Sequence, residues 1–398
     1  MAQATTVTRR DVLRTSLAVS AALAIPACLF AEVSSEKAGK TLRWGIIGTG
    51  ARATRAHIPA IKSFSDDMEI LAVCDVMENH LADGVKRAGD KVQTYTDYQK
   101  LLANKDINAV CIATPNLLHK EMVCAALDAG KHVMCEKPMA VSIDECRAMR
   151  AAHEKHPDLI VLYAMQLRYA GAWATFRKEI EKGAIGKPRH LLFAEFRGDW
   201  NRGDVWQYDD PKLGRKLNWR FSHAASGGTL NEKVCHYFDI LNWMVGAAPQ
   251  RVSCTGGISV YRDDGRDTWD HASTTLTYEN GVQATHSLCM FAPNRLDLQI
   301  VGDEGSLSFG RGAETLVLQA KGKTQPIALP DEIRHGERGP TKGMETAVVK
   351  MYEDFLDCVR NKKKPWMDAD KAMASSRIAW LAERSNDKKQ EVAWDELG

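Results

Sequence analysis

The chain has 398 residues, of which 44% are hydrophobic, and its formal net charge at pH 7 is +2. This length fits two domains better than one, and the hydrophobic content is sufficient for ordinary globular cores. Because the charge is close to neutral and no long basic run follows the N-terminus, a nucleic-acid partner is not expected. No cysteine or histidine spacing in the sequence is typical of a zinc site, so no metal is expected either.

The first 31 residues are predicted to be a twin-arginine export signal. Arg9 and Arg10 precede a short apolar run that ends at Ala31, which is the pattern of such signals. The run is too short for a confident membrane span of about 20 residues. We therefore expect a periplasmic or otherwise exported protein, without a membrane span once the signal is removed, and residues 32–40 as a linker. An uncleaved anchor and lipidation at Cys28, in a weak lipoprotein box, are the alternatives.

A glycine-rich turn follows the first predicted strand, Leu42–Ile47. Residues 48–53 read Gly-Thr-Gly-Ala-Arg-Ala, a G-x-G-x-x-A pattern that indicates dinucleotide binding between a strand and a helix. The first glycine permits a tight turn, the second lets the backbone approach a pyrophosphate, and the small third residue allows close packing. Pro59 should kink or end the following helix. The expected cofactor contacts are Gly48, Thr49, Gly50, Ala51 and Arg52.

Asp75 ends the second predicted strand, Glu69–Cys74. A carboxylate at this place accepts hydrogen bonds from the ribose hydroxyls of NAD and repels the 2′-phosphate of NADP. The sequence therefore favours NAD over NADP. A helix cap is the alternative role of Asp75.

A third strand, Ile107–Ala113, is predicted to end at Thr114-Pro115-Asn116. Thr114 and Asn116 would either bind the ribose or phosphate of a cofactor or cap the helix that follows. Another strand runs over Ile160–Ala164. Strands that alternate with helical stretches over residues 41–160 predict a parallel, doubly wound sheet.

The stretch Val133-Met134-Cys135-Glu136-Lys137-Pro138 is predicted to be a buried strand that stops at a charged pair and a proline. Proline has no N–H for the strand ladder, so Glu136 and Lys137 should lie at the carboxyl end of the strand. Ligands bind at that edge of open parallel sheets. Lys137 is therefore a candidate reactive group, or else a surface lysine beside a turn.

These motifs together, Gly48-x-Gly50, Asp75, Thr114-Pro115-Asn116-x-x-His119 and Glu136-Lys137-Pro138, resemble the glucose–fructose oxidoreductase/inositol dehydrogenase (Gfo/Idh/MocA) family. The resemblance implies a Rossmann doubly wound parallel sheet plus a C-terminal α+β domain with an open, mainly antiparallel sheet. One face of that sheet would be free to associate, giving a homo-oligomer (dimer or tetramer). The implied cofactor is NAD, with further contacts from Thr114, Pro115, Asn116, His119, Glu136, Lys137 and Gln166.

The second domain is expected over residues 161–398, with C-terminal helices within residues 344–384. Arg168 and Tyr169 match an Arg-Tyr pair of the family and are candidate substrate contacts, or else an exposed helix start. The polar, aromatic stretch 199–223 contains Trp219, which would stack on a sugar ring, cover the sheet or form a subunit contact.

Glu232 and His236 are four residues apart in a predicted helix, hence on one face of it. A carboxylate beside a histidine fixes its tautomer and raises its basicity. The pair resembles the Asp-x-x-x-His element of the family, whose histidine transfers protons, with glutamate in place of aspartate. Lys233 and Asp239 are alternative groups for binding hydroxyls. An ordinary surface pair is the alternative reading.

The predicted function is an NAD-dependent oxidoreductase that acts on a hydroxyl or carbonyl carbon of a sugar, polyol or glycoside. His236 would act as the base, Lys137 would donate to the reacting oxygen, and Glu232 would orient His236 and favour its charged form. Because free NAD should be scarce outside the cytoplasm, a tightly bound cofactor is expected. The alternative is an NAD-dependent glycoside hydrolase such as an α-N-acetylgalactosaminidase, although its Tyr-Pro-Thr-His type of sequence is replaced here by residues 234–237. A non-catalytic sugar-binding protein is the third possibility.

Overall fold

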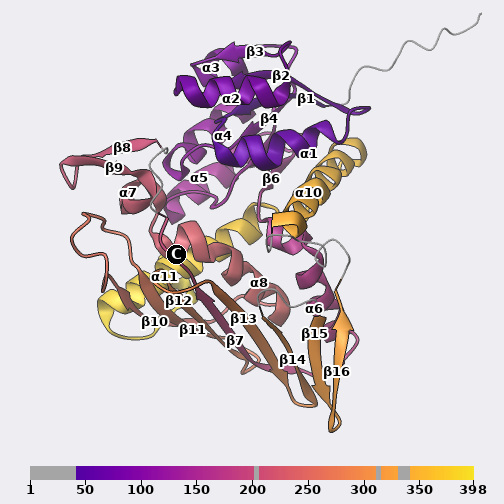
Figure 1. Cartoon of the computed structure of the whole chain (residues 1–398), viewed down its shortest axis with the longest axis vertical. Helices are drawn as coiled ribbons and strands as arrows, with labels where there is room; N and C mark the ends of the chain where they lie inside the picture. The colour runs from indigo at the N-terminus through magenta and orange to yellow at the C-terminus, as the bar shows by residue number, and fades with distance from the viewer. Residues whose placement is uncertain (1–41, 201–205, 311–314, 330–340) are drawn as a thin grey trace, which may run out of the picture. The chain divides into compact units, whose positions relative to one another are not determined.

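The computed structural model describes residues 42–200, 206–310, 315–329 and 341–398 (Figure 1). The predicted export signal, the linker and Cys28 lie outside these ranges. Within these ranges, the helices are too short or too polar to cross a membrane.

Six parallel strands form the first sheet, in the order β3-β2-β1-β4-β5-β6. Its central strands are buried apolar runs, as expected for a sheet that carries helices on both faces. The strands are β1 (Leu42–Ile47), β2 (Met68–Cys74), β3 (Gln93–Tyr95), β4 (Ala109–Ile112), β5 (His132–Cys135) and β6 (Val161–Tyr163). Strand β3 was not predicted, because its three residues are mostly polar and exposed at the sheet edge.

The carboxyl ends of four strands meet at one edge of this sheet. Ile47 at the end of β1 pairs with Cys74 of β2 and with Ile112 of β4, and Ile112 pairs with Cys135 of β5. The residues that follow these ends are therefore neighbours in space, namely Gly48, Asp75, Ala113 and Glu136.

The helix after the glycine turn changes its winding ahead of Pro59. Residues Ala53–His57 form a π-helical turn, and α1 (Ile58–Lys62) begins behind it with Pro59 in its first turn. Proline is tolerated in the first turn of a helix, because the N–H groups there have no hydrogen-bond partner within the helix. In place of the expected kink, the helix changes from π-helical to α-helical winding just before Pro59. The other helices of this part are α2 (Glu78–Ala88), α3 (Tyr98–Leu102), the short η2 (Asn116–Leu118), α4 (His119–Asp128) and α5 (Ile143–Glu154).

The second sheet has nine strands in the order β16-β15-β14-β13-β7-β12-β11-β10-β17. Neighbouring strands are antiparallel except β7 and β12, which are parallel, so the sheet is mixed and mostly antiparallel. The strands are β7 (Pro188–Phe196), β10 (Arg251–Gly257), β11 (His271–Thr277), β12 (Gln283–Cys289), β13 (Arg295–Gly302), β14 (Gly305–Gly310), β15 (Thr315–Ala320), β16 (Lys323–Ala328) and β17 (Val392–Ala393). Together with the first sheet, this confirms the predicted fold class.

Helices lie on one side of the second sheet, between it and the first sheet (Figure 1). They are α6 (Gly171–Glu181), α8 (Cys235–Val245) and α11 (Ala369–Lys388). Between β7 and α8 the chain forms the β8–β9 hairpin (Gln207–Asp210 and Arg215–Asn218), η4 (Trp219–Phe221), α7 (His223–Ser226) and the π-helical η5 (Leu230–Val234). Two further short turns are η3 (Gln166–Tyr169) and η6 (Trp394–Leu397).

The chain returns from the second sheet to the first through α10 (Thr341–Asn361). Tyr352 and Phe355 of α10 pack on Trp44 of β1, with ring centroids 5.2 and 5.1 Å apart. Strand β6 also lies beyond residue 160, where a domain boundary was expected. One hydrophobic cluster contains residues of both sheets, for example Trp44 of β1 and Leu191 of β7, so the two sheets share a core.

Candidate active site

The glycine turn has the backbone geometry that dinucleotide loops need. Gly48 has a φ of +87°, and a Cβ there would lie 2.7 Å from the carbonyl oxygen of Ala113. Only glycine fits such a position. The small residue Ala53 is fully buried under the turn. A Cβ at Gly50 would lie 3.8 Å from its nearest neighbour, the ring of His80, so the Gly50 backbone can be approached from outside.

The carboxylate of Asp75 forms a hydrogen bond with the backbone of the same turn. One carboxylate oxygen, Oδ2, accepts from the backbone N–H of Thr49 at 2.7 Å, and the other accepts from the N–H of Met77 at 2.9 Å. An ionised carboxylate has about four acceptor positions. The Thr49 hydroxyl also donates to Oδ2 at 3.3 Å. One acceptor position therefore remains, on Oδ1, and this position fits a ribose hydroxyl in the adenosine half of NAD.

Glu136 is buried at the end of β5 among three cationic or donor groups. Its Oε1 accepts from Arg52 Nε and, at 2.8 Å, from His57 Nε2, while Oε2 accepts from the backbone N–H of Lys137 at 3.0 Å. Burial alone would raise the pKa of Glu136, but Arg52, His57 and Lys137 hold that pKa well below its usual range. The carboxylate is therefore ionised and fixed beside Lys137.

His57 and Tyr352 support Glu136 from behind. His57 Nδ1 lies 2.9 Å from the hydroxyl of Tyr352, and both side chains are fully buried. Burial lowers the pKa of His57, but Cys111 and Glu136 more than offset this effect and raise that pKa to about 9. Neither residue was predicted for the site, because they are 295 positions apart in the chain and no spacing connects them.

Lys137 reaches from the first sheet to the π-helical turn η5. Its Nζ donates to Glu232 twice, to the carbonyl oxygen at 2.5 Å and to the carboxylate Oε2 at 2.8 Å. The Lys137–Pro138 peptide bond is cis. An ammonium has three N–H donors, so one donor of Lys137 remains after the two bonds to Glu232.

Glu232 does not pair with His236, which corrects the predicted role. Its carboxylate accepts from Lys137 and, at 3.1 Å, from Arg220 Nε. Burial would raise the pKa of Glu232, but Lys137 and Arg220 lower it overall. The prediction assumed α-helical spacing, whereas residues 230–234 form a π-helix with i→i+5 hydrogen bonds. Glu232 therefore positions Lys137. Arg220 was missed, because nothing in the sequence links it to Glu232.

His236 is neutral in this site, which also differs from the prediction. Burial, Lys137 and Lys233 lower the pKa of His236 well below its usual range. Its Nδ1 is buried and has no hydrogen-bond partner among the described residues. A neutral imidazole next to a lysine is suited to accept a proton from a substrate hydroxyl.

Two residues after β4 form hydrogen bonds with backbone carbonyl groups of neighbouring loops. His119 is fully buried, and its two ring nitrogens lie 2.8 and 3.1 Å from the carbonyl oxygens of Pro138 and Thr114. The amide of Asn116 donates to the carbonyl of Ser226 at 2.8 Å. Both ring nitrogens of His119 thus face backbone carbonyl oxygens, whereas Asn116 keeps its amide oxygen and one amide N–H for a cofactor. Pro115 precedes η2 and has no N–H to offer.

Gln166 has the surroundings expected of a ligand contact. The residue is 4% exposed, and its Oε1 is buried with no hydrogen-bond partner in the described part of the chain. Arg52 Nη2 is also buried and has no hydrogen-bond partner among the described residues. Buried polar atoms are nearly always paired, so these two atoms fit a polar group bound at the sheet edge.

Several residues that were expected to contact the substrate instead contact other residues of the protein. Arg168 forms a bidentate pair with Asp239, with N···O distances of 2.7 and 2.8 Å. The hydroxyl of Tyr169 donates to Asp354 of α10 at 2.6 Å. Trp219 is 7% exposed and lies under the guanidinium of Arg220. These four residues, Arg168, Tyr169, Trp219 and Asp239, therefore have structural partners within the protein, and their role as substrate contacts stays a prediction.

Replacing Arg168 with methionine is expected to destabilise the fold by about 3–5 kcal/mol, because it leaves the buried Asp239 carboxylate without its partner. Urea unfolding followed by circular dichroism measures this loss. The double variant Arg168→Met, Asp239→Leu is expected to recover most of it, because an apolar pair needs no charge compensation. A double variant as unstable as the single one would contradict this account.

Comparisons with known proteins identify the relatives of this chain. A model described as oxidoreductase family, NAD-binding Rossmann fold, matches residues 42–163, and one for the GFO/IDH/MocA C-terminal domain matches residues 173–308. The chain is 32% identical over 256 residues to levoglucosan dehydrogenase of Pseudarthrobacter phenanthrenivorans, covering 57% of this chain and 61% of that protein. It is 24% identical to myo-inositol 2-dehydrogenase of Thermotoga maritima, covering 89% and 99% of the two chains.

The fold is also that of a solved relative. The structure of levoglucosan dehydrogenase in complex with NADH and levoglucosan has a TM-score of 0.74 to this chain, at 22% identity, and covers 89% of this chain and 100% of its own. With both halves of the chain matched, and with the glycine turn and the Glu-Lys-Pro strand end in place, this protein belongs to the GFO/IDH/MocA oxidoreductase family.

Proposed function

We propose that this protein is an NAD-dependent oxidoreductase that acts on a CH–OH group of a sugar, polyol or glycoside. The observation that carries the proposal is the meeting of Lys137, at the nucleotide-binding edge of the first sheet, with Glu232 and the neighbouring His236 of the second part. The family is one of oxidoreductases with an NAD-binding domain. Relatives with levoglucosan and inositol dehydrogenase names support the substrate class.

The chain's own residues handle the proton and the reacting oxygen. NAD, when bound, supplies the acceptor for a hydride from the substrate carbon. The remaining N–H of Lys137 donates to the hydroxyl oxygen and stabilises the negative charge that develops on it. His236, which is neutral, accepts the hydroxyl proton. Glu232 and Glu136 keep Lys137 in place through its ammonium and its backbone N–H.

A panel of aldoses, polyols and aryl glycosides tests the function. Formation of reduced nicotinamide on a sugar or polyol is the expected result. Release of aglycone without net reduction would favour the redox-assisted glycoside hydrolase, which the named relatives do not support. Binding without any turnover would favour the non-catalytic sugar-binding protein.

Replacing Asp75 with asparagine is expected to shift the preference between the two cofactors toward NADP by about 10- to 100-fold. The amide keeps acceptor oxygen near Thr49 but removes the charge that repels a 2′-phosphate, and a charge pair of this kind is worth roughly 1–4 kcal/mol. The ratio of dissociation constants for NAD and NADP, measured by calorimetry, checks this. Asp66→Asn at an exposed position is the control, and an unchanged ratio in Asp75→Asn would contradict the assignment.

We further propose that the protein is exported through the twin-arginine route with its cofactor tightly held. The support is the Arg9-Arg10 pair ahead of a short apolar run, together with the scarcity of free NAD outside the cytoplasm. Changing both arginines to lysine should retain the protein in the cytoplasm, as fractionation would show. Protein purified without nicotinamide absorbance, and with only weak affinity for NAD, would contradict the tight-binding part.

A homo-oligomer, a dimer or a tetramer, is proposed through the helix-free side of the second sheet. That side carries a shallow trough of about 550 Å³, lined by Leu192, Ala194, Thr285, Ser287 and Val317 among others. Leu192, one of its lining residues, is 44% exposed although it is a large apolar residue. Leu192→Arg is expected to give a monomer in light scattering, while Lys120→Arg, at an exposed helical position, should not. An unchanged mass of the Leu192→Arg variant would contradict this interface.

A further inference from the structure

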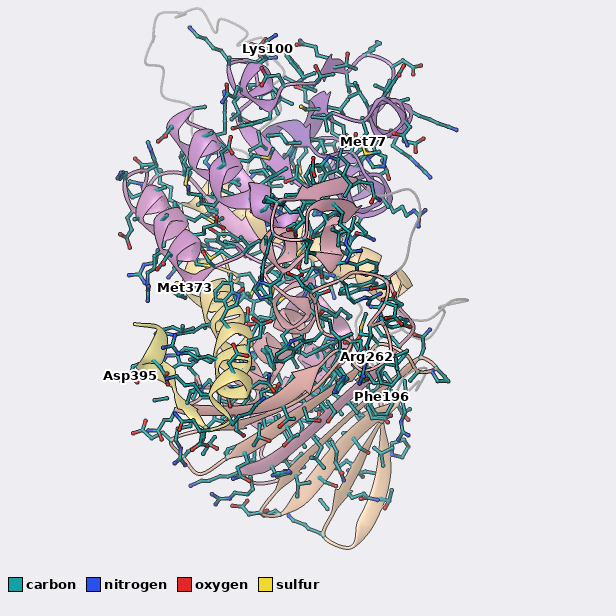
Figure 2. The ribbon with its side chains drawn as sticks, turned by 90° about the vertical axis from the view of Figure 1, so that its left-hand side faces the viewer. Met77, Lys100, Phe196, Arg262, Met373 and Asp395 are labelled. Carbon is teal, nitrogen blue, oxygen red and sulfur yellow. The ribbon has the colours of Figure 1, made fainter. Side chains whose placement is uncertain are left out.

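A second polar cluster lies beside His236, formed by Glu195, Lys233 and Tyr237. Lys233 Nζ is 2.7 Å from Glu195 Oε1 and 3.2 Å from the hydroxyl of Tyr237, which donates to the same carboxylate oxygen at 3.3 Å. Glu195 is contributed by the end of β7, Lys233 by η5 and Tyr237 by α8. Figure 2 places Phe196, the residue after Glu195, at the end of the second sheet that lies toward the first.

The cluster is buried and rigid. Glu195 is 5% and Tyr237 7% exposed. The ring of Tyr237 is tilted against Phe193, with centroids 4.5 Å apart, and stacks on His286 at 5.5 Å, which fixes the direction of its hydroxyl. The ammonium of Lys233 lies 4.7 Å above the same ring. A charged pair held this way loses little freedom when a ligand binds.

One oxygen of the cluster has no partner. Glu195 Oε2 is buried and accepts no hydrogen bond from any of the described residues. An unpaired buried carboxylate oxygen is unfavourable, whereas a ligand hydroxyl would satisfy it. Lys233 and Tyr237, which both bind the other oxygen of Glu195, lie on either side of His236 in the chain. The unpaired oxygen therefore lies in the neighbourhood of the proposed base.

We infer that Glu195 and Lys233 form a second hydroxyl-binding position, which recognises a hydroxyl of the carbohydrate other than the one that is oxidised. Glu195 Oε2 accepts from this hydroxyl, and Lys233 donates to its oxygen. The inference rests on the proposed function and narrows it to polyhydroxylated substrates. A site built to bind a hydroxyl rejects analogues that lack it far more strongly than an apolar pocket rejects a missing methylene.

Calorimetry of NAD-loaded protein tests the inference without requiring turnover. The probes are D-glucose, D-galactose, myo-inositol and levoglucosan, followed by the monodeoxy analogues of the one that binds the wild type tightest. Glu195→Gln keeps the shape of the side chain and is expected to weaken binding of that parent compound by about 10- to 100-fold. One monodeoxy analogue is expected to bind the wild type and Glu195→Gln equally weakly. Glu304→Gln, at an exposed turn of the same sheet, is the matched control.

Lys233→Gln is a second variant, and it should show the same loss toward the same hydroxyl. Parent binding as tight in both variants as in Glu304→Gln would overturn the inference, as would failure of the wild type to bind any of the four compounds. The proposed function has a separate readout: binding with the expected pattern but without reduction of NAD would contradict the oxidoreductase and leave the hydroxyl position standing.

Discussion

Replacing Lys137 with methionine is expected to lower kcat by about 10²–10³-fold while the affinity for NAD stays within a few-fold of the wild type. Methionine keeps the length and the apolar stem but offers no N–H to the reacting oxygen. Lys137 is held by two hydrogen bonds to Glu232, at 2.5 and 2.8 Å, so its third donor has a defined direction. Steady-state rates on a substrate from the carbohydrate panel and a titration with NAD measure the two quantities.

The control for this prediction is Lys120→Met, which removes an exposed lysine of the same sheet domain. It should leave both quantities unchanged. A rate close to that of the wild type in Lys137→Met would remove Lys137 from the chemistry. A parallel loss of NAD affinity would instead assign it to cofactor binding.

Replacing His236 with asparagine is expected to lower kcat by about 10²–10⁴-fold, because the base that accepts the hydroxyl proton is lost. The pH dependence gives a second readout. Burial, Lys137 and Lys233 lower the pKa of His236, and the deprotonated form is the active one. In the wild type, kcat/KM should therefore fall only on acidification below pH 6.5, the usual pKa of histidine, and this acid limb should be absent from the variant.

His156→Asn, a substitution of a surface histidine that is 32% exposed at its side chain, is the matched control. It should keep both the rate and the acid limb. An acid limb above about pH 6.5 in the wild type would mean that a different group, or a charged His236, controls the reaction. If kcat/KM of His236→Asn still fell on acidification, a group other than His236 would control the reaction.

The parts of the fold that local chemistry determines could be predicted from the sequence. Gly48, the strand end at Cys74 and the stop at Pro138 each follow from backbone rules. Because parallel strands align their ends, these rules also place Asp75 and Glu136 at one edge. The family resemblance follows from the same short stretches.

Partners distant in the chain could not be predicted. Arg168 pairs with Asp239 across 71 positions and Tyr169 with Asp354 across 185. The sequence alone assigns Arg168 and Tyr169 to the substrate, because an arginine and a tyrosine after a strand look alike whether they bind a ligand or a distant helix. Burial of His119 between two carbonyls is invisible in the sequence for the same reason.

The role of Glu232 was mispredicted for a more specific reason. Its spacing to His236 is correct for an α-helix, but a π-helical turn replaces one turn there. A similar turn occurs before Pro59. Such turns depend on tertiary packing, and they are frequent at functional sites. Here the turn directs Glu232 toward Lys137 and leaves His236 without a carboxylate among its described hydrogen-bond partners.

Transfer of deuterium tests the central claim most directly. Carbohydrates that carry deuterium on their ring carbons are incubated with the NAD-loaded protein, and the mass of the recovered cofactor is measured. The account predicts that a sugar or polyol gives reduced cofactor containing one deuterium, and that Lys137→Met and His236→Asn strongly slow its appearance. Absence of deuterium in the cofactor for every compound that binds would contradict an oxidoreductase acting on CH–OH groups.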